Sequence, residues 1–350
     1  MKRWLLILLL LPRLAHSQFC GYTAHANYNL TGVSNTTISG DSVSSIVLTN
    51  CTNVHIFKVR VQGSTGVAIK LNNCTNIRID SSYVENVQQG IIAQNCNGTI
   101  IKHNYIHNVL GAPGQTYHPV QFITCTHGHI DSNKIEEDPI VTQYSHDQIS
   151  LYQSNGTLGD SITVIGNWIR GGQTQMNGSG PGGFIGGNNG ACGINLTDSG
   201  GAYQVARGNY VINGGYIGMQ VDGAGSSAKM DHNFIYSSRT NISLVGISYY
   251  TTSHSYPGPS SIEVSNNHIT WNKNSGGIYN KFHDVSLSAP IGWTSNTADN
   301  SADGAANSTM IPTPMVTSCA APSPPPPPPI VGPVIHGRKA KIISYDFCRY

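Results

Sequence analysis

The chain has 350 residues, of which 39% are hydrophobic and only 10% are charged, and its formal net charge is +2. The hydrophobic share is sufficient for a core, which excludes an intrinsically disordered chain. The small net charge argues against a nucleic-acid-binding protein, because such proteins usually concentrate basic residues on one face. Low charge combined with many Gly, Asn, Ser, Thr and β-branched residues predicts an all-β protein.

Residues 1–17 have the pattern of a secretory signal peptide. Lys2 and Arg3 precede the apolar run Leu5 to Leu11, and Ala15 and Ser17 frame a cleavage site. A membrane anchor is the alternative, but seven apolar residues cannot span a bilayer, which takes about 20. We therefore expect a secreted, extracellular protein without a membrane span.

Residues 37–293 repeat a unit of about two dozen residues, which we interpret as one rung of a solenoid. Its first marker is a pair of apolar residues two positions apart, which face the same side of a strand and point into the core. The pairs are Ile46/Leu48, Ile69/Leu71, Ile91/Ala93, Val120/Phe122, Ile149/Leu151, Ile194/Leu196 and Met219/Val221. Residues 18–36, irregular and polar, are expected to form an N-terminal cap over the first rung.

The second marker is an asparagine with an apolar residue three positions before it and an aliphatic residue two positions after it. These asparagines are Asn104, Asn133, Asn167, Asn209, Asn233 and Asn267. Asn suits a bend because it tolerates left-handed backbone angles, and its amide can bond to the Asn of the next rung. Both markers together predict a single-stranded right-handed parallel β-helix of roughly nine rungs, whose stacking buries a continuous core.

The eight cysteines fall into two groups. One group follows the repeat period and is expected to stack at a corner as small buried residues, pairing only where the geometry allows. This group consists of Cys51, Cys74, Cys96 and Cys125. The other group lies outside the repeat and holds the better disulfide candidates of an exported protein. It consists of Cys20, Cys192, Cys319 and Cys348.

The repeat fades near its C-terminal end. Residues 294–333 are expected to be a linker, first rich in Ser, Thr and Asn and then almost pure proline, which favours an extended polyproline II spacer. Residues 334–350 form a short basic tail, too short for a core of its own. Three interpretations of residues 334–350 remain open: a basic tail, a tether to the cell wall, or the stub of a truncated second module. The proline-rich spacer offers a contact to a cell wall or a partner.

The repeat strings Ser132–Ile135 and Val164–Ile169 resemble those of the pectate-lyase-like superfamily of secreted β-helix proteins, over about 240 residues. The segments His146–Asn155 and Ala202–Val205 are similar to uncharacterised exported bacterial members. The superfamily includes pectate and alginate lyases, polygalacturonases and mannuronan C-5 epimerases. The resemblance implies a polysaccharide lying along one long parallel sheet, with catalytic residues that point outward from adjacent rungs.

On this chain, the resemblance places substrate-binding side chains at the outward positions of the marked strand and beside it. The candidates are Lys70, His118, Gln121, Gln148, Ser150, Asn195 and Gln220. Amide and hydroxyl groups match sugar hydroxyls without strong charge. The alternative is that any solvated strand face is polar.

His146 and Asp147, with Tyr152 nearby, are the candidate catalytic residues for removing the proton α to a uronate carboxylate, a step that lyases and C5-epimerases share. The Asp-Pro-His-Asp string of alginate epimerases is not met, because Asp138-Pro139 is separate from His146-Asp147. The alternative is that Asp147 caps a turn by bonding the backbone while His146 is simply exposed.

Asp147, Asp198 and Asp222, one per successive rung, form a second catalytic candidate. Two carboxylates roughly 6.5–9.5 Å apart can run an inverting hydrolysis, but the polygalacturonase strings are missing, so a lyase or epimerase is favoured over a glycoside hydrolase. The same carboxylates could bind Ca²⁺, and no other cofactor is expected. If Asp147 and Asp198 are buried, or lie on opposite faces of the coil, a site that the two carboxylates share is excluded.

Two further features bear on this face. Lys70 and Arg170 are the basic residues near it that could neutralise a substrate carboxylate. The chain also has many Asn-x-Ser/Thr sequons, and a glycan on Asn195 would block the face. We predict an extracellular polysaccharide-interacting β-helix protein that acts as a lyase or C5-epimerase on an acidic polysaccharide. The alternative is a non-catalytic glycan-binding, adhesive or cell-wall structural protein, which low charge, missing motifs and the proline spacer favour.

Overall fold

The computed structural model describes residues 21–112, 115–137, 145–171, 192–212, 217–222, 227–237, 245–250, 261–271, 280–284 and 290–299. All of them except Gly21 belong to one compact unit, Tyr22–Thr313. The expected signal peptide, the basic tail and most of the expected linker lie outside the described residues. Within these residues, one 3₁₀ turn, η1 (Trp293–Ser295), accompanies the strands, and no helix is long and apolar enough to cross a membrane.

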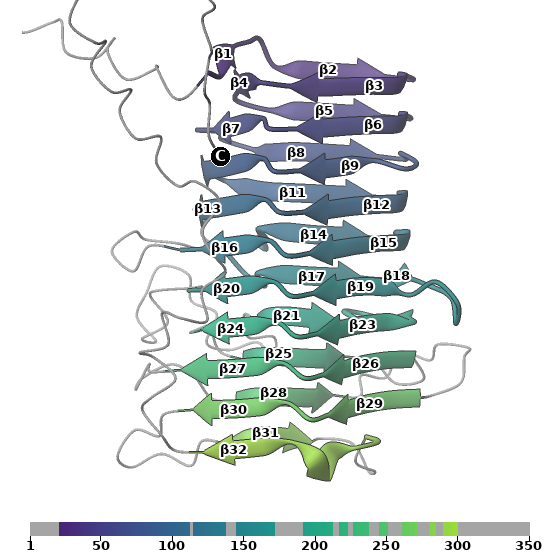
Figure 1. The fold of residues 1–350 in the computed structure, drawn as a ribbon, viewed down its shortest axis with the longest axis vertical. Helices are drawn as coiled ribbons and strands as arrows, with labels where there is room; N and C mark the ends of the chain where they lie inside the picture. The colour runs from purple at the N-terminus through teal and green to yellow at the C-terminus, as the bar shows by residue number, and fades with distance from the viewer. Residues whose placement is uncertain are drawn as a thin grey trace, which may run out of the picture. The chain divides into compact units, whose positions relative to one another are not determined.

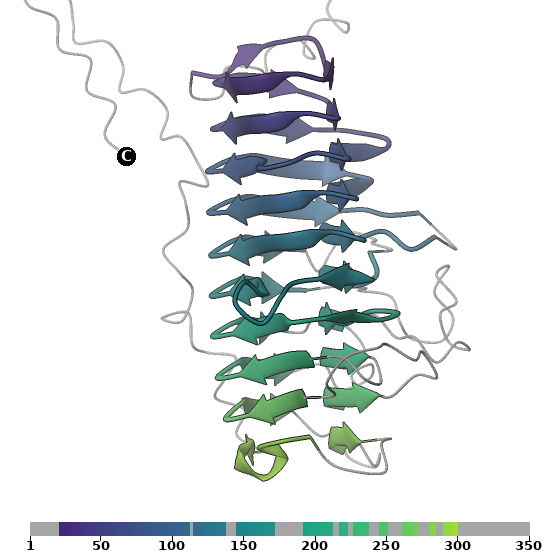
Figure 2. The same cartoon turned by 90° about the vertical axis from the view of Figure 1, so that its right-hand side faces the viewer.

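Each turn of the coil gives one strand to each of three sheets, and the strands of successive turns stack in register (Figures 1 and 2). Sheet B comes first in each turn and consists of β2 (Tyr28–Thr31), β5 (Ile46–Thr49), β8 (Val67–Asn72), β11 (Gln89–Gln94), β14 (Val120–Ile123), β17 (Ile149–Tyr152), β21 (Cys192–Leu196), β25 (Ile217–Asp222), β28 (Val245–Tyr250) and β31 (Asn280–Asp284). Sheet C follows and consists of β3 (Ser34–Ser39), β6 (Thr52–Phe57), β9 (Arg78–Asp80), β12 (Asn97–Lys102), β15 (Thr126–Asp131), β19 (Ile162–Ile165), β23 (Gln204–Arg207), β26 (Ser227–Asp231) and β29 (Ser261–Ser265), with the short β18 (Ser154–Asn155) and β22 (Gly201–Ala202) beside them.

Sheet A closes each turn. It consists of β1 (Thr23–Ala24), β4 (Asp41–Val43), β7 (Arg60–Gln62), β10 (Tyr83–Val87), β13 (Tyr105–Val109), β16 (Lys134–Glu136), β20 (Trp168–Arg170), β24 (Tyr210–Ile212), β27 (Phe234–Ser237), β30 (His268–Trp271) and β32 (Thr297–Asp299). The three sheets are parallel throughout the described strands, so the predicted right-handed parallel β-helix is confirmed. Ten strands of sheet B are described, against roughly nine rungs expected.

The coil reaches beyond both ends of the repeat. The strands β1 and β2 and the start of β3 fall within the segment expected as a cap, and they pair in register with the second turn. At the other end, β32 pairs with β30 and carries sheet A to Asp299. The first turn covers the core by continuing it, which satisfies the backbone groups that a free sheet edge would expose.

The inward pairs of sheet B line the core as predicted. Ile69, Ile91, Val120 and Ile149 follow one another in register and are 0% exposed. Burial of an aliphatic side chain of this size contributes about 1.5–3 kcal/mol. Because each rung has only one or two such residues per sheet, the core is stable only as a stack.

The predicted asparagine ladder stands at the bend between sheets C and A. The predicted amide bond to the Asn of the next rung is confirmed, whereas the left-handed angle expected at the Asn itself is wrong. The ladder side chains are almost wholly buried, and each Oδ1 accepts both the main-chain N–H and the Nδ2–H of the preceding ladder Asn at 2.8–3.0 Å. The left-handed backbone angle belongs to the residue before each Asn, such as His103 (φ 55°) or Ser132 (φ 54°). Asn is therefore required for its paired donor and acceptor, not for its backbone freedom.

The ladder also has two ends that the repeat did not reveal. Ser82 N–H donates to Asn104 Oδ1 at 2.9 Å, and Asn267 donates twice to Asn296 Oδ1 at 2.9 and 2.8 Å. Asn296 follows η1 and returns a bond from its Nδ2 to Val264 O at 2.9 Å. The ladder thus runs beyond Asn267, the last asparagine that the repeat identified.

The thiol corner between sheets B and C is confirmed as a stack of small buried residues. Its four cysteines are unpaired, and each follows a residue with a left-handed angle. Cys96 Sγ accepts the N–H of Cys74 at 3.4 Å, and Ser154 Oγ accepts the N–H of Cys125 at 3.0 Å in the equivalent position. Cys192 is also buried, and its Sγ lies 3.5 Å from Gln220 Oε1, whereas the other three candidates for a disulfide, Cys20, Cys319 and Cys348, lie outside the described residues.

Candidate functional site

The residue between each inward pair of sheet B points outward, and these residues form the first outward row. The row runs through Lys70, Ile92, Gln121, Ser150, Asn195 and Gln220, which are successive register partners. Its ends are half-buried, but its middle is not an open face, because Gln121, Ser150 and Asn195 are 9%, 0% and 5% exposed. The middle residues of this row are therefore covered by other parts of the protein and are not exposed to solvent.

A second outward row lies two residues farther along each strand. It contains Thr49, Asn72, Gln94, Ile123 and Tyr152, which are successive register partners and are all half-buried. Apart from Tyr152, none of these residues was among the predicted site residues, which were taken from the position inside each inward pair and from the ends of the strands. The strand period of two, which places residues i and i+2 on one face, was the signal that could have found it.

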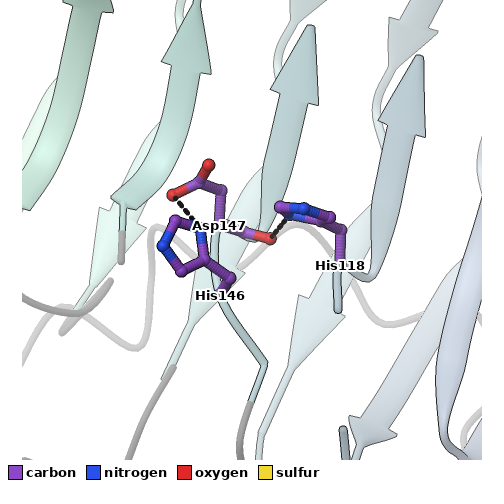
Figure 3. A group of neighbouring side chains, drawn as sticks. All are labelled: His118, His146 and Asp147. Atoms are coloured by element: carbon purple, nitrogen blue, oxygen red, sulfur yellow. Dashed lines mark hydrogen bonds and ion pairs between the residues drawn. The ribbon is translucent and has the colours of Figure 1, made fainter. Parts of the chain in front are cut away.

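A local irregularity gathers ionisable side chains at the N-terminal end of β14 and β17. Tyr117 pairs with Ser145, and Val120 pairs with Ile149, so two residues on one turn face three on the next. The extra residue is a β-bulge, which re-aims side chains and occurs often beside functional sites. It brings together His118 from the shorter segment with His146 and Asp147 from the longer one (Figure 3).

We call these three residues the His–His–Asp centre. His146 Nδ1 lies 3.2 Å from Asp147 Oδ1, and the two imidazole rings meet edge to face with centroids 5.7 Å apart. One ligating atom from each of the three residues lies within 4.8 Å of the other two. All three side chains are buried, at 3% for His118, 8% for His146 and 1% for Asp147.

Asp147 is held by more than its histidine neighbour. Its Oδ1 accepts the N–H of Cys192 at 2.8 Å, and its Oδ2 accepts Asn195 Nδ2 at 3.2 Å. Burial by itself raises the pKa of Asp147, but the charge and hydrogen bond of His146, then His118 and the Cys192 N–H, outweigh it and hold the pKa below its ordinary value. Asp147 is therefore an ionised, buried carboxylate that joins the turn of β17 to that of β21.

The two carboxylates of the hypothesised Asp147–Asp198 pair have different surroundings, because Asp147 is buried. Asp198 is half-buried, and its Oδ2 accepts the Ser150 hydroxyl at 2.9 Å. Ser150 and Asn195 are register partners that separate the two carboxylates. Asp222 ends β25, where its main chain pairs with Tyr250. Of the alternative given for His146 and Asp147, the backbone bond of Asp147 is present, to the N–H of Cys192, but the exposure of His146 is wrong, since His146 is buried in the centre.

His118 is neutral in the folded protein. Burial lowers its pKa to about 4, although Asp147 partly opposes the shift. Its Nδ1 lies 3.1 Å from the main-chain oxygen of Asp147, and because a carbonyl only accepts, Nδ1 carries the proton. The lone pair of His118 is consequently on Nε2, which can accept a proton or bind a metal ion.

Two buried amide oxygens beside the centre accept no hydrogen bond within the described part of the chain. Gln148, 0% exposed, uses its Nε2 to donate to Ser145 Oγ at 3.2 Å, which leaves Oε1 without a donor. Asn195 uses its Nδ2 on Asp147, which leaves its Oδ1 without one. A buried acceptor without a partner costs about 1–3 kcal/mol, so both oxygens need a donor or a cation.

The charges around this face differ from those expected. Arg170 lies on β20 of sheet A and forms an ion pair with Glu136 there, so it does not serve sheet B. Lys70 is the cation of the first outward row, three register steps from Ser150. The centre combines two imidazoles with a carboxylate, whereas Ca²⁺ prefers oxygen ligands. Chemically, the centre can either transfer a proton through His146 held by Asp147, or hold a nitrogen-preferring cation.

The burial of Asn195 gives a prediction for glycosylation. Asn50, Asn73 and Asn97 stand in exposed sequons, whereas Asn195 is 5% exposed and bonded to Asp147. After secretion from a eukaryotic host, we expect glycans on exposed sequons and none on Asn195, because a glycan there cannot fit in the fold. Glycopeptide mass spectrometry measures the occupancy, and a folded product glycosylated at Asn195 would contradict the buried position.

No protein-family model and no curated protein sequence matches the chain. Among solved structures, it is similar to a hyperthermoactive exopolygalacturonase from Thermotoga maritima, with 11% identity, a TM-score of 0.44 and 73% of each chain covered. It is also similar to an alginate lyase from Paenibacillus sp. str. FPU-7, with 10% identity, a TM-score of 0.30, and 79% of this chain and 91% of that chain covered. These similarities concern the fold.

Proposed function

We propose that the outer face of sheet B binds an acidic polysaccharide outside the cell. The observation that carries this proposal is the second outward row, in which polar or aromatic side chains recur on nearly every turn at one position and are half-buried. Successive strands are about 4.8 Å apart, so a polymer lying across them meets a hydrogen-bonding side chain at each of these five turns except that of Ile123. Lys70, half-buried beside Asn72, supplies a positive charge for a carboxylate.

The contact residues of this proposal are Lys70, Asn72, Gln94 and Tyr152, with Gln220 on a later turn. The Tyr152 ring offers an apolar surface for the C–H face of a sugar, and its hydroxyl remains a polar group. Gln121 and Ser150 lie beneath this face and bond to each other and to its neighbours. Gln121 Nε2 donates to Ser150 Oγ at 3.5 Å, and Ser150 donates to Asp198. These buried residues position the sheet rather than contact the polymer.

The binding proposal predicts that Lys70→Ala and Tyr152→Ala each weaken polysaccharide binding about tenfold, because a lost polar contact costs on the order of 1.4 kcal/mol. Binding is measured by isothermal titration with alginate, pectate and a neutral glucan. Lys102→Ala and Tyr210→Ala are matched controls, as both residues are half-buried on other sheets. Equal losses in the controls, or no binding to any polymer by the unaltered protein, would refute the proposal.

A second candidate function is proton abstraction by a lyase or C5-epimerase. The 3.2 Å contact of His146 with a carboxylate that two further donors hold favours it, because such a carboxylate orients an imidazole and stabilises its protonated form. A lyase would form an unsaturated uronate that absorbs in the ultraviolet, and an epimerase would incorporate deuterium from D₂O at C5. His146→Ala would abolish either signal, whereas binding without either product identifies a non-catalytic protein.

A further inference from the structure

We propose that the His–His–Asp centre is a binding site for a divalent transition-metal ion of the Zn²⁺ type. The inference stands on the geometry of His118, His146 and Asp147 and does not depend on a polysaccharide ligand. It does exclude the proton-transfer candidate, because a His146 ring that binds metal through Nδ1 is no longer held by Asp147 as a base. The polysaccharide-binding face is unaffected, since its contact residues are different ones.

The spacing of the donors is close to that of a tetrahedral site. With metal–nitrogen and metal–oxygen bonds of about 2.0–2.2 Å, neighbouring ligand atoms stand roughly 3.4 Å apart. His146 Nδ1 and Asp147 Oδ1 are already 3.2 Å apart. The largest separation in the group, 4.8 Å, must shorten by about 1.4 Å, a distance that small side-chain rotations cover.

The unpartnered amide oxygens are the second observation that points to a ligand. Asn195 touches the Asp147 carboxylate through Nδ2, so its Oδ1 lies at the edge of the same centre, 5% exposed and without a donor. Gln148 follows Asp147 in the bulge and has a fully buried Oε1 in the same condition. A cation, or a water molecule bound to one, would satisfy an oxygen that no described donor reaches.

The donor types select the class of ion. Imidazole nitrogen suits zinc, copper, iron and nickel, whereas Ca²⁺ and Mg²⁺ favour oxygen. Histidines that bind metal usually donate their other N–H to a carbonyl or carboxylate, and His118 makes such a bond to the Asp147 carbonyl at 3.1 Å. His118, His146 and Asp147 are all buried, so a cation held by them would be enclosed by protein.

The site would join two consecutive turns of the coil. His118 precedes β14, and His146 and Asp147 precede β17 on the next turn. Three protein ligands leave a fourth position for water in a tetrahedral site, and the burial of all three closes that position to bulk solvent. Metal binding should therefore raise the thermal stability of the chain, because a ligand that binds only the folded state stabilises it by mass action.

The test uses the full chain, freed of metal with a chelator and titrated with Zn²⁺, Co²⁺ and Ca²⁺. We expect one Zn²⁺ per chain, a rise in Tm with Zn²⁺ and none with Ca²⁺. Co²⁺ should give the visible absorption of nitrogen and oxygen ligands without a thiolate charge-transfer band. His118→Ala and His146→Ala should each weaken Zn²⁺ binding by about 100-fold. The Co²⁺ spectrum needs no variant, so it decides the question even if a variant fails to fold.

A second His–Asp pair in the same chain provides the control. His232 Nδ1 lies 3.1 Å from Asp231 Oδ2, but the His232 side chain is 64% exposed and belongs to no three-residue group among the described residues. His232→Ala should leave Zn²⁺ affinity unchanged. The proposal would be overturned if the unaltered protein did not bind Zn²⁺. It would also be overturned if His118→Ala and His146→Ala took up as much Zn²⁺ as the unaltered protein, because the free thiols would then be the ligands.

Discussion

Replacement of Asn167 by Ala is expected to lower the free energy of unfolding by about 3–5 kcal/mol. Asn167 is 0% exposed, and its Oδ1 accepts both the N–H and the Nδ2–H of Asn133 at 2.9 and 3.0 Å. Its Nδ2 donates to Ile130 O at 2.7 Å. Alanine would remove the acceptor of two Asn133 donors and the side-chain donor to Ile130 O, although Asn133 Nδ2 keeps its bond to Ile101 O at 2.8 Å. Each buried polar group left without a partner costs about 1–3 kcal/mol before relaxation.

The measurement is urea denaturation, followed by hydrogen exchange of the amides of Asn133 and Asn167. Asn53→Ala is the matched control, since Asn53 also bonds to an Asn of the preceding turn, at 3.0 Å, but lies exposed on the outer corner. We expect the control to cost about 1 kcal/mol, much of it from its left-handed angle. Equal costs at the two positions would mean that burial of the ladder is not what makes it strong.

Gly90→Ala is expected to destabilise the protein by about 3 kcal/mol and to disturb the His–His–Asp centre. A Cβ at Gly90 would stand 2.0 Å from Pro119 O and 2.8 Å from Pro119 C, both main-chain atoms. Gly90 N–H donates to His118 O at 3.0 Å, so the displaced segment includes the first residue of the centre. Overpacking of this kind costs about 1–3 kcal/mol where side chains can yield, and backbone yields less.

Gly66→Ala serves as the control, because a Cβ there meets nothing within 4 Å. Gly66 lies directly before β8, one turn earlier than Gly90, and we expect its change to alter the free energy of unfolding by less than about 1 kcal/mol. The readouts are the urea midpoint and the chemical shifts of the His118 ring. A Gly90→Ala protein as stable as Gly66→Ala would show that the turn at Pro119 can shift freely.

The fold was predictable because its repeat appears in the sequence at every rung. The inward pairs and the ladder asparagines fix which residues face the core, and the register agrees with them. The repeat did not identify Asn296 as a ladder residue, because its turn contains η1. Trp293 occupies the position where other turns have a smaller apolar residue. The positions of the left-handed backbone angles could not be predicted, because they fall on residues of varied type, such as His103, Ser132 and Gly166.

The candidate site was predictable only in part. His146 and Asp147 stood out as adjacent ionisable residues, but the addition of His118 depends on a bulge. The sequence hints at that bulge only through spacing, since two steps separate His118 from Val120 and three separate His146 from Ile149. Burial of Ser150 and Asn195 was not predictable, because strand periodicity tells which face a side chain takes and not what lies above that face.

The asparagine ladder has a direction, and this direction determines where a folded fragment can end. Ser82 donates once to Asn104, and in each later step through to Asn296 the earlier Asn donates twice and the later Asn accepts. A chain shortened before Asn296 would keep β30, lose β32 and leave the N–H and Nδ2–H of Asn267 without the Asn296 acceptor. The stable C-terminal boundary of the solenoid is thus set by Asn296, the final acceptor of the ladder. A designer who transplants turns of this coil must supply an Asn, or a substitute carbonyl, after the last turn retained.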